Sequence, residues 1–142
     1  MTDVSIFKAY DVRGKYPDQI DEALAYRIGR AFPPVLAQLE GTPVEEQRIA
    51  VGRDMRLSSP ALASAFIEGA MAQGADVVDY GMIATDMLYF AVARDGHDGG
   101  VQITASHNPK QYNGMKMVRK EAFPLSGDEG LAEIREMIQN VE

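Results

Sequence analysis

Short runs of β-branched and other apolar residues alternate along this chain with longer segments in which apolar residues recur every three or four positions. The short runs, at residues 48–52, 76–80 and 101–104, are typical of buried strands, and the longer segments have the period of amphipathic helices. Alternating strands and helices favour an α/β sandwich. We therefore predict a three-layer α/β/α sandwich with a mostly parallel, mixed sheet of about four strands. Residues 4–7 and 115–118 are further candidate strands.

Turn-forming residues set the expected limits of the first elements. Apolar residues recur through residues 20–39 and predict a helix there. Pro33 and Pro34 lie inside this segment, so we expect the helix to end or kink near Phe32. Residues 11–18 are rich in glycine, proline and aspartate, and this composition predicts a loop.

Capping residues indicate where the later helices begin. Ser58 or Ser59 is expected to cap a helix whose first turn contains a proline. Thr85 is expected to cap the following helix in the same way. A last helix is predicted over residues 128–139, where apolar residues again recur at helical spacing.

Length and composition narrow the class of protein. A chain of 142 residues, 46% of them hydrophobic, suits a single domain over residues 1–142 with its own core. It has no cysteine, which excludes disulfides and thiolate chemistry. The net charge of −7 disfavours nucleic acid as a partner. The sequence also lacks a membrane-spanning apolar run and a signal-peptide pattern, so we expect a cytoplasmic protein without membrane contacts.

The segment after the strand at 101–104 carries the most reactive pattern of the chain. Its sequence is Thr104-Ala105-Ser106-His107-Asn108-Pro109. It places a hydroxyl beside an imidazole at the carboxyl end of a strand, where open α/β sheets bind their ligands. Such a serine can carry a phosphoryl group if a base or an electrostatic field activates it. The alternative is that Ser106 and Asn108 only form a turn.

A phosphorylated Ser106 would carry nearly two negative charges and would need cations or backbone N–H groups nearby. Arg13 is one candidate, because a guanidinium can bind phosphate at two points. Lys110 and Lys116 follow the serine in the sequence and are further candidates. The alternative for Arg13 is a surface ion pair with Asp11, which would contribute little to stability.

The two histidines of the chain are the other candidate titrating groups. His107 could exchange protons near neutral pH or orient its neighbours. His97 lies in the run Asp95-Gly96-His97-Asp98, which superficially resembles a metal site. We interpret this run as an ordinary loop, because Mg²⁺ takes few protein carboxylates in a tight octahedral geometry.

Four segments resemble the α-D-phosphohexomutase family. Residues 104–109, with the run Tyr112-Asn113-Gly114-Met115-Lys116 after them, resemble its phosphoserine loop. Residues 7–14 resemble its N-terminal substrate-side loop, and residues 51–56 and 81–91 are also similar to the family. Tyr10 and Tyr112 are similar to the phosphomannomutase/phosphoglucomutase branch of the family.

The resemblance covers the first, phosphoserine-bearing domain of a four-domain enzyme. It implies an intramolecular phosphotransferase, an isomerase that interconverts hexose 1-phosphate and hexose 6-phosphate through a bisphosphorylated intermediate, with mannose or glucose as the sugar. The hexose phosphate and the remaining domains are the implied partners. The chain alone is expected to be inactive, and to self-associate if apolar surface is left exposed.

The resemblance also implies roles for individual residues. Ser106 would be the nucleophile and phosphate carrier, and Mg²⁺ would bind an oxygen of its phosphate, with the other metal ligands in a missing domain. Arg13 and Lys116 would bind substrate and stabilise charge, Lys116 also as an acid–base group. His107 would assist protonation or orientation, and Tyr10 would shape the substrate site. Two alternatives stay open, a stand-alone non-catalytic domain that binds phosphosugars or a partner, and part of a phosphoglucosamine mutase.

Overall fold

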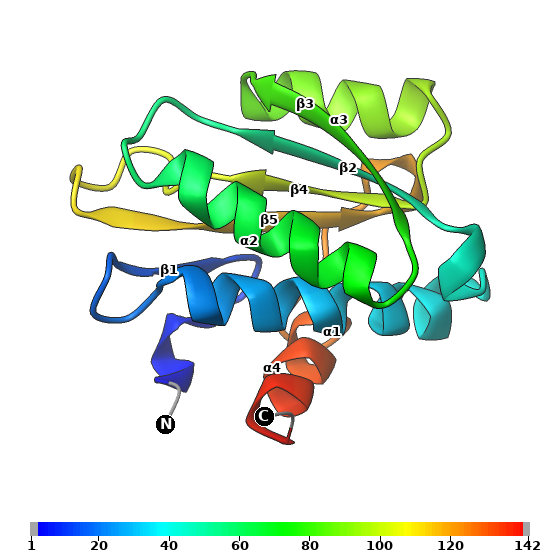
Figure 1. Ribbon diagram of the computed structural model, residues 1–142, viewed down its shortest axis with the longest axis horizontal. Helices are drawn as coiled ribbons and strands as arrows, with labels where there is room; N and C mark the ends of the chain where they lie inside the picture. The colour runs from blue at the N-terminus through cyan, green and yellow to red at the C-terminus, as the bar shows by residue number, and fades with distance from the viewer. Residues whose placement is uncertain (1–2, 141–142) are drawn as a thin grey trace.

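Five strands form one mixed sheet in the order β1-β5-β4-β2-β3 (Figure 1). The computed structural model describes residues 3–140. Strand β2 pairs in parallel with β3 and β4, whereas β5 is antiparallel to both β4 and β1. The strands are β1 (Val12–Lys15), β2 (Arg48–Arg53), β3 (Asp76–Met82), β4 (Gly99–Ile103) and β5 (Tyr112–Arg119). The helices are α1 (Glu22–Glu40), α2 (Ser59–Ala72), α3 (Thr85–Arg94) and α4 (Leu131–Asn140), with short 3₁₀ turns at Val4–Ile6, Val44–Glu46 and Lys120–Ala122.

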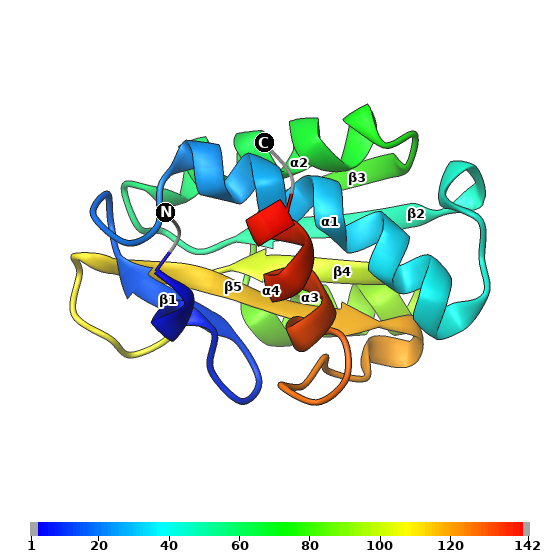
Figure 2. The same cartoon turned by 90° about the horizontal axis from the view of Figure 1, so that it is seen from below.

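Helices cover both faces of the sheet. Seen from below in Figure 2, α1 and α2 lie on one side of the strands and α3 lies on the other. Buried residues of α1, α2 and α4 form a large core with one face of the sheet, in which Phe32 packs beside Phe66. On the opposite face, Leu88 and Val92 of α3 form a smaller core with Ala50 and Val118. The predicted three-layer α/β/α sandwich is therefore confirmed.

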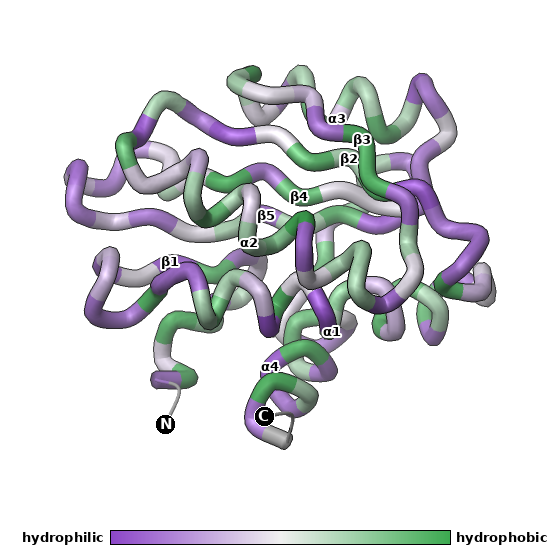
Figure 3. Tube along the Cα trace, viewed as in Figure 1, coloured by the Kyte–Doolittle hydropathy of each residue, from purple (hydrophilic) through white to green (hydrophobic). Residues whose placement is uncertain are grey.

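The central strands are buried on both faces, which explains their nearly continuous apolar sequence. In β2, Val51 belongs to the core of α1 and α2, while its neighbour Ala50 faces α3. All five residues of β4 are buried. Figure 3 shows hydrophobic residues gathered along the inner strands and hydrophilic residues in the connecting loops. Within residues 3–140, no helix is both long enough and apolar enough to cross a bilayer.

Helix α1 continues through its two prolines to Glu40, so the prediction that it could end near Phe32 is wrong. A proline has no N–H to donate to the carbonyl four residues earlier. For Pro34 that carbonyl belongs to Arg30, and Gln73 Nε2 donates to it at 2.9 Å. The side chain from the end of α2 replaces the missing donor, and α1 runs on to the left-handed Gly41 (φ +79°).

The sheet has one strand more than the sequence predicted, because β1 forms within the segment expected to be a loop. Only four residues long, β1 pairs with β5 so that Arg13 lies opposite Gly114. The candidate strand at 4–7 is a 3₁₀ turn over Val4–Ile6, and only Phe7 bridges to Val12. Pairing with a strand a hundred residues away, rather than local sequence, creates β1.

Two expected helix starts also change. Helix α3 is preceded by Ala84 in the capping position rather than by Thr85, and α4 begins at Leu131, three residues later than predicted. Ser58 does occupy the N-cap of α2, but its side chain caps no N–H. Its hydroxyl accepts a hydrogen bond from Asn113 at 2.7 Å, while the Ser59 hydroxyl donates to Asp54 at 2.6 Å. The two serines thus connect α2 to β5 and to the loop after β2.

Candidate active site

Ser106 lies exposed on a tight turn at the carboxyl end of β4, as the sequence predicted. Its backbone has the left-handed φ of +55°, which is uncommon for a residue other than glycine. The Ser106 N–H donates to Thr104 Oγ1 at 3.0 Å. Asn108 closes the turn, because its backbone N–H and its Nδ2 both donate to the Ala105 carbonyl. The turn holds the serine out of the sheet, at an edge where a ligand can approach it.

A pocket of about 350 Å³ opens beside Ser106. Three separate parts of the chain form it, namely the serine turn, strand β5 and the segment leading into β1. The residues that line it include Lys8, Tyr10, Asp11, Arg13, Ser106 and Lys116. The structure therefore brings four of the five predicted site residues together around one cavity.

Asp11 holds the two main cations of this pocket. Its carboxylate accepts from Arg13 Nε at 3.1 Å through one oxygen and from Lys116 Nζ at 3.1 Å through the other. Asp11 is only 6% exposed, whereas the two cationic side chains remain partly exposed. Charge-assisted bonds of this kind fix the direction of both cations. The Asp11–Arg13 contact is therefore part of the pocket wall rather than an isolated surface pair.

The sheet places Arg13 and Lys116 on the same face. Arg13 lies opposite Gly114, which is two residues from Lys116 on β5, and side chains two residues apart on a strand point to the same face. Lys116 in turn lies opposite Gln102 of β4. This is the α3 side of the sheet, since Val118 continues the same row and packs against α3. Register thus places both cations on the α3 face of the sheet, and the shared pocket brings them beside Ser106.

The other cations near Ser106 in sequence lie elsewhere. Lys110 lines a separate cavity of about 560 Å³. Arg119 bonds to Glu40 at 2.7 Å and to Glu129, and hydrogen bonding to Glu40 raises the pKa of the Arg119 guanidinium. Lys120 lies 3.7 Å from Asp98. Lys8 joins the serine pocket instead.

His107 is exposed next to Ser106 but is not among the residues that line the pocket. Tyr10 does line the pocket and is 65% exposed. The catalytic roles of Ser106, His107, Lys116 and Arg13, and the substrate role of Tyr10, stay predictions. The structure gives the positions of these side chains.

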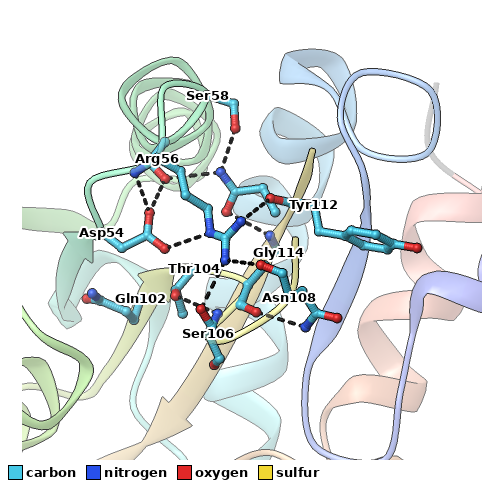
Figure 4. A network of polar contacts seen from close by, with 12 residues as sticks. Asp54, Arg56, Ser58, Gln102, Thr104, Ser106, Asn108, Tyr112 and Gly114 are labelled. Carbon is cyan, nitrogen blue, oxygen red and sulfur yellow. Dashed lines mark hydrogen bonds and ion pairs between the residues drawn. The ribbon is translucent and has the colours of Figure 1, made fainter. Parts of the chain in front are cut away.

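Arg56 was not among the candidate residues, although its contacts with the serine turn are the most numerous of any side chain among residues 3–140. Figure 4 shows its guanidinium surrounded by the backbone of residues 106–112. Its carboxylate partner is Asp54, at 3.2 Å. The signal available in the sequence was the run Gly52-Arg53-Asp54-Met55-Arg56, which follows the carboxyl end of β2 beside β4.

The described residues do not fit a complete Mg²⁺ site. Among residues 3–140, no group of three or more histidine and carboxylate side chains could hold a metal ion. Asp11, the carboxylate that lines the pocket, is already bonded to Arg13 and Lys116. A phosphate on Ser106 could bind Mg²⁺ through its own oxygen atoms, but it would not supply the remaining ligands of the ion. The second histidine, His97, is buried beside Tyr80, whose hydroxyl lies 2.7 Å from His97 Nε2.

Fold and pocket together define an α/β protein with a cation-lined serine at the carboxyl edge of its sheet. The model of the phosphoglucomutase/phosphomannomutase α/β/α domain I matches residues 4–142. Phosphomannomutases from Klebsiella pneumoniae and Escherichia coli are each 45% identical over 139 residues, 98% of this chain. The match covers 83% of the Klebsiella protein and 29% of the Escherichia protein.

A solved structure agrees with these matches. The crystal structure of a phosphoglucomutase/phosphomannomutase family protein from Burkholderia thailandensis superimposes with a TM-score of 0.85 at 39% identity. The superposition covers 99% of this chain and 31% of that one. This chain belongs to the phosphoglucomutase/phosphomannomutase family and corresponds to its α/β/α domain I. It spans less than a third of several curated relatives that it matches.

Proposed function

We propose that this chain supplies the phosphoryl-carrying serine of a phosphohexomutase, with Ser106 as the carrier. The observation that carries the proposal is the pocket in which an exposed Ser106 shares one cavity with Arg13 and Lys116. A phosphoserine is close to a dianion and needs such cations beside it. The turn positions the Ser106 hydroxyl, and Arg13 and Lys116 supply the positive charge that a phosphate on it needs.

In the proposed reaction, a phosphoryl group passes from Ser106 to the sugar and another returns to Ser106. A hydroxyl oxygen of the hexose phosphate attacks phosphorus, the bond between phosphorus and Ser106 Oγ breaks, and the proton of the sugar hydroxyl ends on Ser106 Oγ. The sugar then carries two phosphates. Once it is reoriented, transfer of its other phosphate returns a phosphoryl group to Ser106 and leaves the isomeric monophosphate. Each step exchanges one O–P bond for another.

The cations would act mainly through positioning and charge. Phosphoryl transfer depends on alignment of the two oxygens and on stabilisation of the charge around phosphorus. Arg13 can bind two phosphate oxygens, and the Lys116 ammonium can stabilise Ser106 Oγ as it leaves and relay to it the proton that the sugar hydroxyl gives up. Asp11 keeps both cations aimed at the pocket. His107 and Tyr10 would complete the site by assisting protonation and by contacting the sugar.

The substrate is a hexose phosphate, with mannose or glucose as the sugar. Any Mg²⁺ would need ligands from outside this chain, since residues 3–140 contain no cluster of metal-binding side chains. We place sugar selection outside this chain as well. We therefore expect this chain alone not to turn over hexose phosphates. Turnover by the chain alone in a coupled mutase assay would overturn that expectation, and binding without turnover in the complete gene product would favour a non-catalytic phosphosugar-binding domain.

The assignment of Ser106 is tested with the polypeptide encoded by the complete gene. After incubation with a hexose bisphosphate, intact mass should show one phosphoryl group on the wild-type protein and none on Ser106→Ala. The matched control is Ser64→Ala, which changes an exposed serine of α2 and should leave incorporation unchanged. Equal phosphate incorporation by Ser106→Ala and the wild type would exclude Ser106 as the carrier.

A further inference from the structure

The guanidinium of Arg56 is bound on several sides by the backbone of the serine turn (Figure 4). One terminal nitrogen, Nη2, donates to the carbonyls of Ser106 at 3.0 Å and Asn108 at 2.8 Å. The other, Nη1, donates to the carbonyls of Pro109 at 2.9 Å and Tyr112 at 3.1 Å. Four carbonyls of one seven-residue segment therefore converge on a single side chain.

Asp54 anchors this side chain to the body of the domain. Asp54 Oδ2 accepts from Arg56 Nε at 3.2 Å, and Oδ1 accepts from the Arg56 backbone N–H at 3.0 Å. Oδ1 also accepts from the hydroxyl of Ser59, which is fully buried at the start of α2. Asn113 donates to the same hydroxyl at 3.0 Å. The serine turn is thus tied through Arg56 and Asp54 to a helix and to β5.

Arg56 reaches the turn from the side away from the reaction. It lines the cavity that contains Lys110, not the pocket shared by Ser106 and Lys116. Its donors are all engaged with carbonyls or with Asp54, and its side chain is only 11% exposed. It therefore acts on the serine through the backbone rather than by touching a phosphate.

The chemistry of the contact requires arginine. A guanidinium carries five N–H donors in a rigid plane, so it can hold four carbonyls and a carboxylate at once. A lysine ammonium has three donors on a flexible stem and cannot span the same set. The contact includes the carbonyl of Ser106 itself, which has an uncommon left-handed φ. Without the contact, the turn is free to relax toward the ordinary region of φ and ψ.

We propose that Arg56 is a positioning residue for phosphoryl transfer, which holds Ser106 in the conformation that directs its phosphate at Arg13 and Lys116. The proposal rests on the proposed function of Ser106 and adds to it a residue that touches neither phosphate nor substrate. Asp54 is a second positioning residue, because it holds the guanidinium of Arg56, which in turn holds the serine turn.

The test uses this chain with phosphoserine encoded at position 106. The pKa of the phosphate is followed by ³¹P NMR titration, and exchange of the hydrogen-bonded backbone amides of Ser106, Asn108 and Tyr112 reports on the turn. The variants are Arg56→Lys and Asp54→Asn. The matched control is Arg119→Lys, which also changes an arginine that binds carboxylates and a backbone carbonyl, but at a site remote from the turn.

In the wild-type chain, the cations should hold the phosphate pKa below that of free phosphoserine. Arg56→Lys should return it toward the free value and speed exchange of the turn amides by at least about tenfold. Arg119→Lys should change neither, even if it lowers overall stability as much. If Arg56→Lys fails to fold, Asp54→Asn carries the test, with a smaller change in the same direction.

Two results distinguish a failure of the proposed function of Ser106 from a failure of the proposed role of Arg56. If the wild-type phosphate titrates like free phosphoserine, the pocket does not hold it, and the proposed function of Ser106 fails. If the wild-type pKa is lowered and the folded Arg56 and Asp54 variants keep the same titration and the same slow exchange, the function stands and the role of Arg56 is wrong.

Discussion

Gly114 is the residue at which the structure makes its sharpest prediction about how the site is built. It lies on β5 opposite Arg13 of β1. A Cβ added there would lie 1.9 Å from the Val12 carbonyl oxygen, where ordinary van der Waals contact begins at 3.4 Å. The next nearest atoms, at 2.9 and 3.0 Å, are also backbone atoms of Val12 and Arg13. No side-chain rotation relieves such a clash, so Gly114→Ala must push β1 away from β5.

The size of the effect follows from this geometry. Overpacking a well-packed site typically costs about 1–3 kcal/mol. We expect about 3 kcal/mol here, at the upper end of that range, because every clashing atom belongs to the backbone. The loss is limited by the place of β1 at the edge of the sheet, from which it can recede without disturbing β4 or β2. For a domain of this size, the melting temperature should fall by roughly 6–12 °C.

The assay is urea unfolding followed by far-ultraviolet circular dichroism, since the chain has no tryptophan to report by fluorescence. Gly127→Ala is the control, because its added Cβ would lie at an ordinary 3.6 Å from the nearest atom. The control should stay within about 0.5 kcal/mol of the wild type. The reasoning is refuted if Gly114→Ala does the same.

Two further predictions concern charged and titrating groups. Asp11→Asn removes the carboxylate shared by the two pocket cations and should lower the free energy of unfolding by about 1–2 kcal/mol, discounted because both cations can turn to solvent. The exposed control Asp128→Asn should have no measurable effect, and equal urea midpoints for the two variants would contradict the account. Burial, with a smaller contribution from Arg48, lowers the pKa of His97 below its ordinary 6.5, so the unfolded chain binds a proton that the folded chain does not. Folding stability should therefore fall as the pH drops below 6.5 toward the folded-state pKa. His97→Gln should make the free energy of unfolding depend less on pH in this range. An unchanged pH dependence in urea titrations would show that other groups produce it.

The elements that the sequence predicted are those whose pattern is local. The strands β2, β3 and β4 were found because each is an apolar run between turn-forming residues. Strand β1 was missed because its four residues include a glycine, are followed by a proline-containing turn, and find their partner only in β5. No local pattern reports a pairing between positions 13 and 114.

The prolines of α1 show the same limit for a helix. Pro33 and Pro34 oppose a helix by local rules, and those rules are physically correct. The helix nevertheless continues here because Gln73, from the end of α2, supplies a donor to the Arg30 carbonyl that Pro34 leaves unpaired. Tertiary contacts also hold α1 against α2, where Phe32 packs beside Phe66. A prediction that reads one segment at a time cannot include a donor from another.

The site residues also differ in whether a local sequence pattern could locate them. Ser106 could be located from sequence because it directly follows a recognisable strand. Arg13 and Lys116 were selected by charge, and only the register of β1 and β5 places them on one face beside the serine. Arg56 was missed because its partners lie about fifty residues away and are backbone carbonyls, which carry no residue-specific signal.

The charge of the chain explains why these contacts matter together. A protein with a net charge of −7 would on average repel a phosphate. Around Ser106 the balance is reversed, since Lys8, Arg13 and Lys116 face Asp11 alone in the pocket. Asp11 holds Arg13 and Lys116 at the pocket by ion pairs, whereas the guanidinium of Arg56 is bound to the carbonyls behind the turn. In the proposed function, the pocket cations are therefore left for a phosphate, and a separate arginine binds the backbone of the turn that carries Ser106.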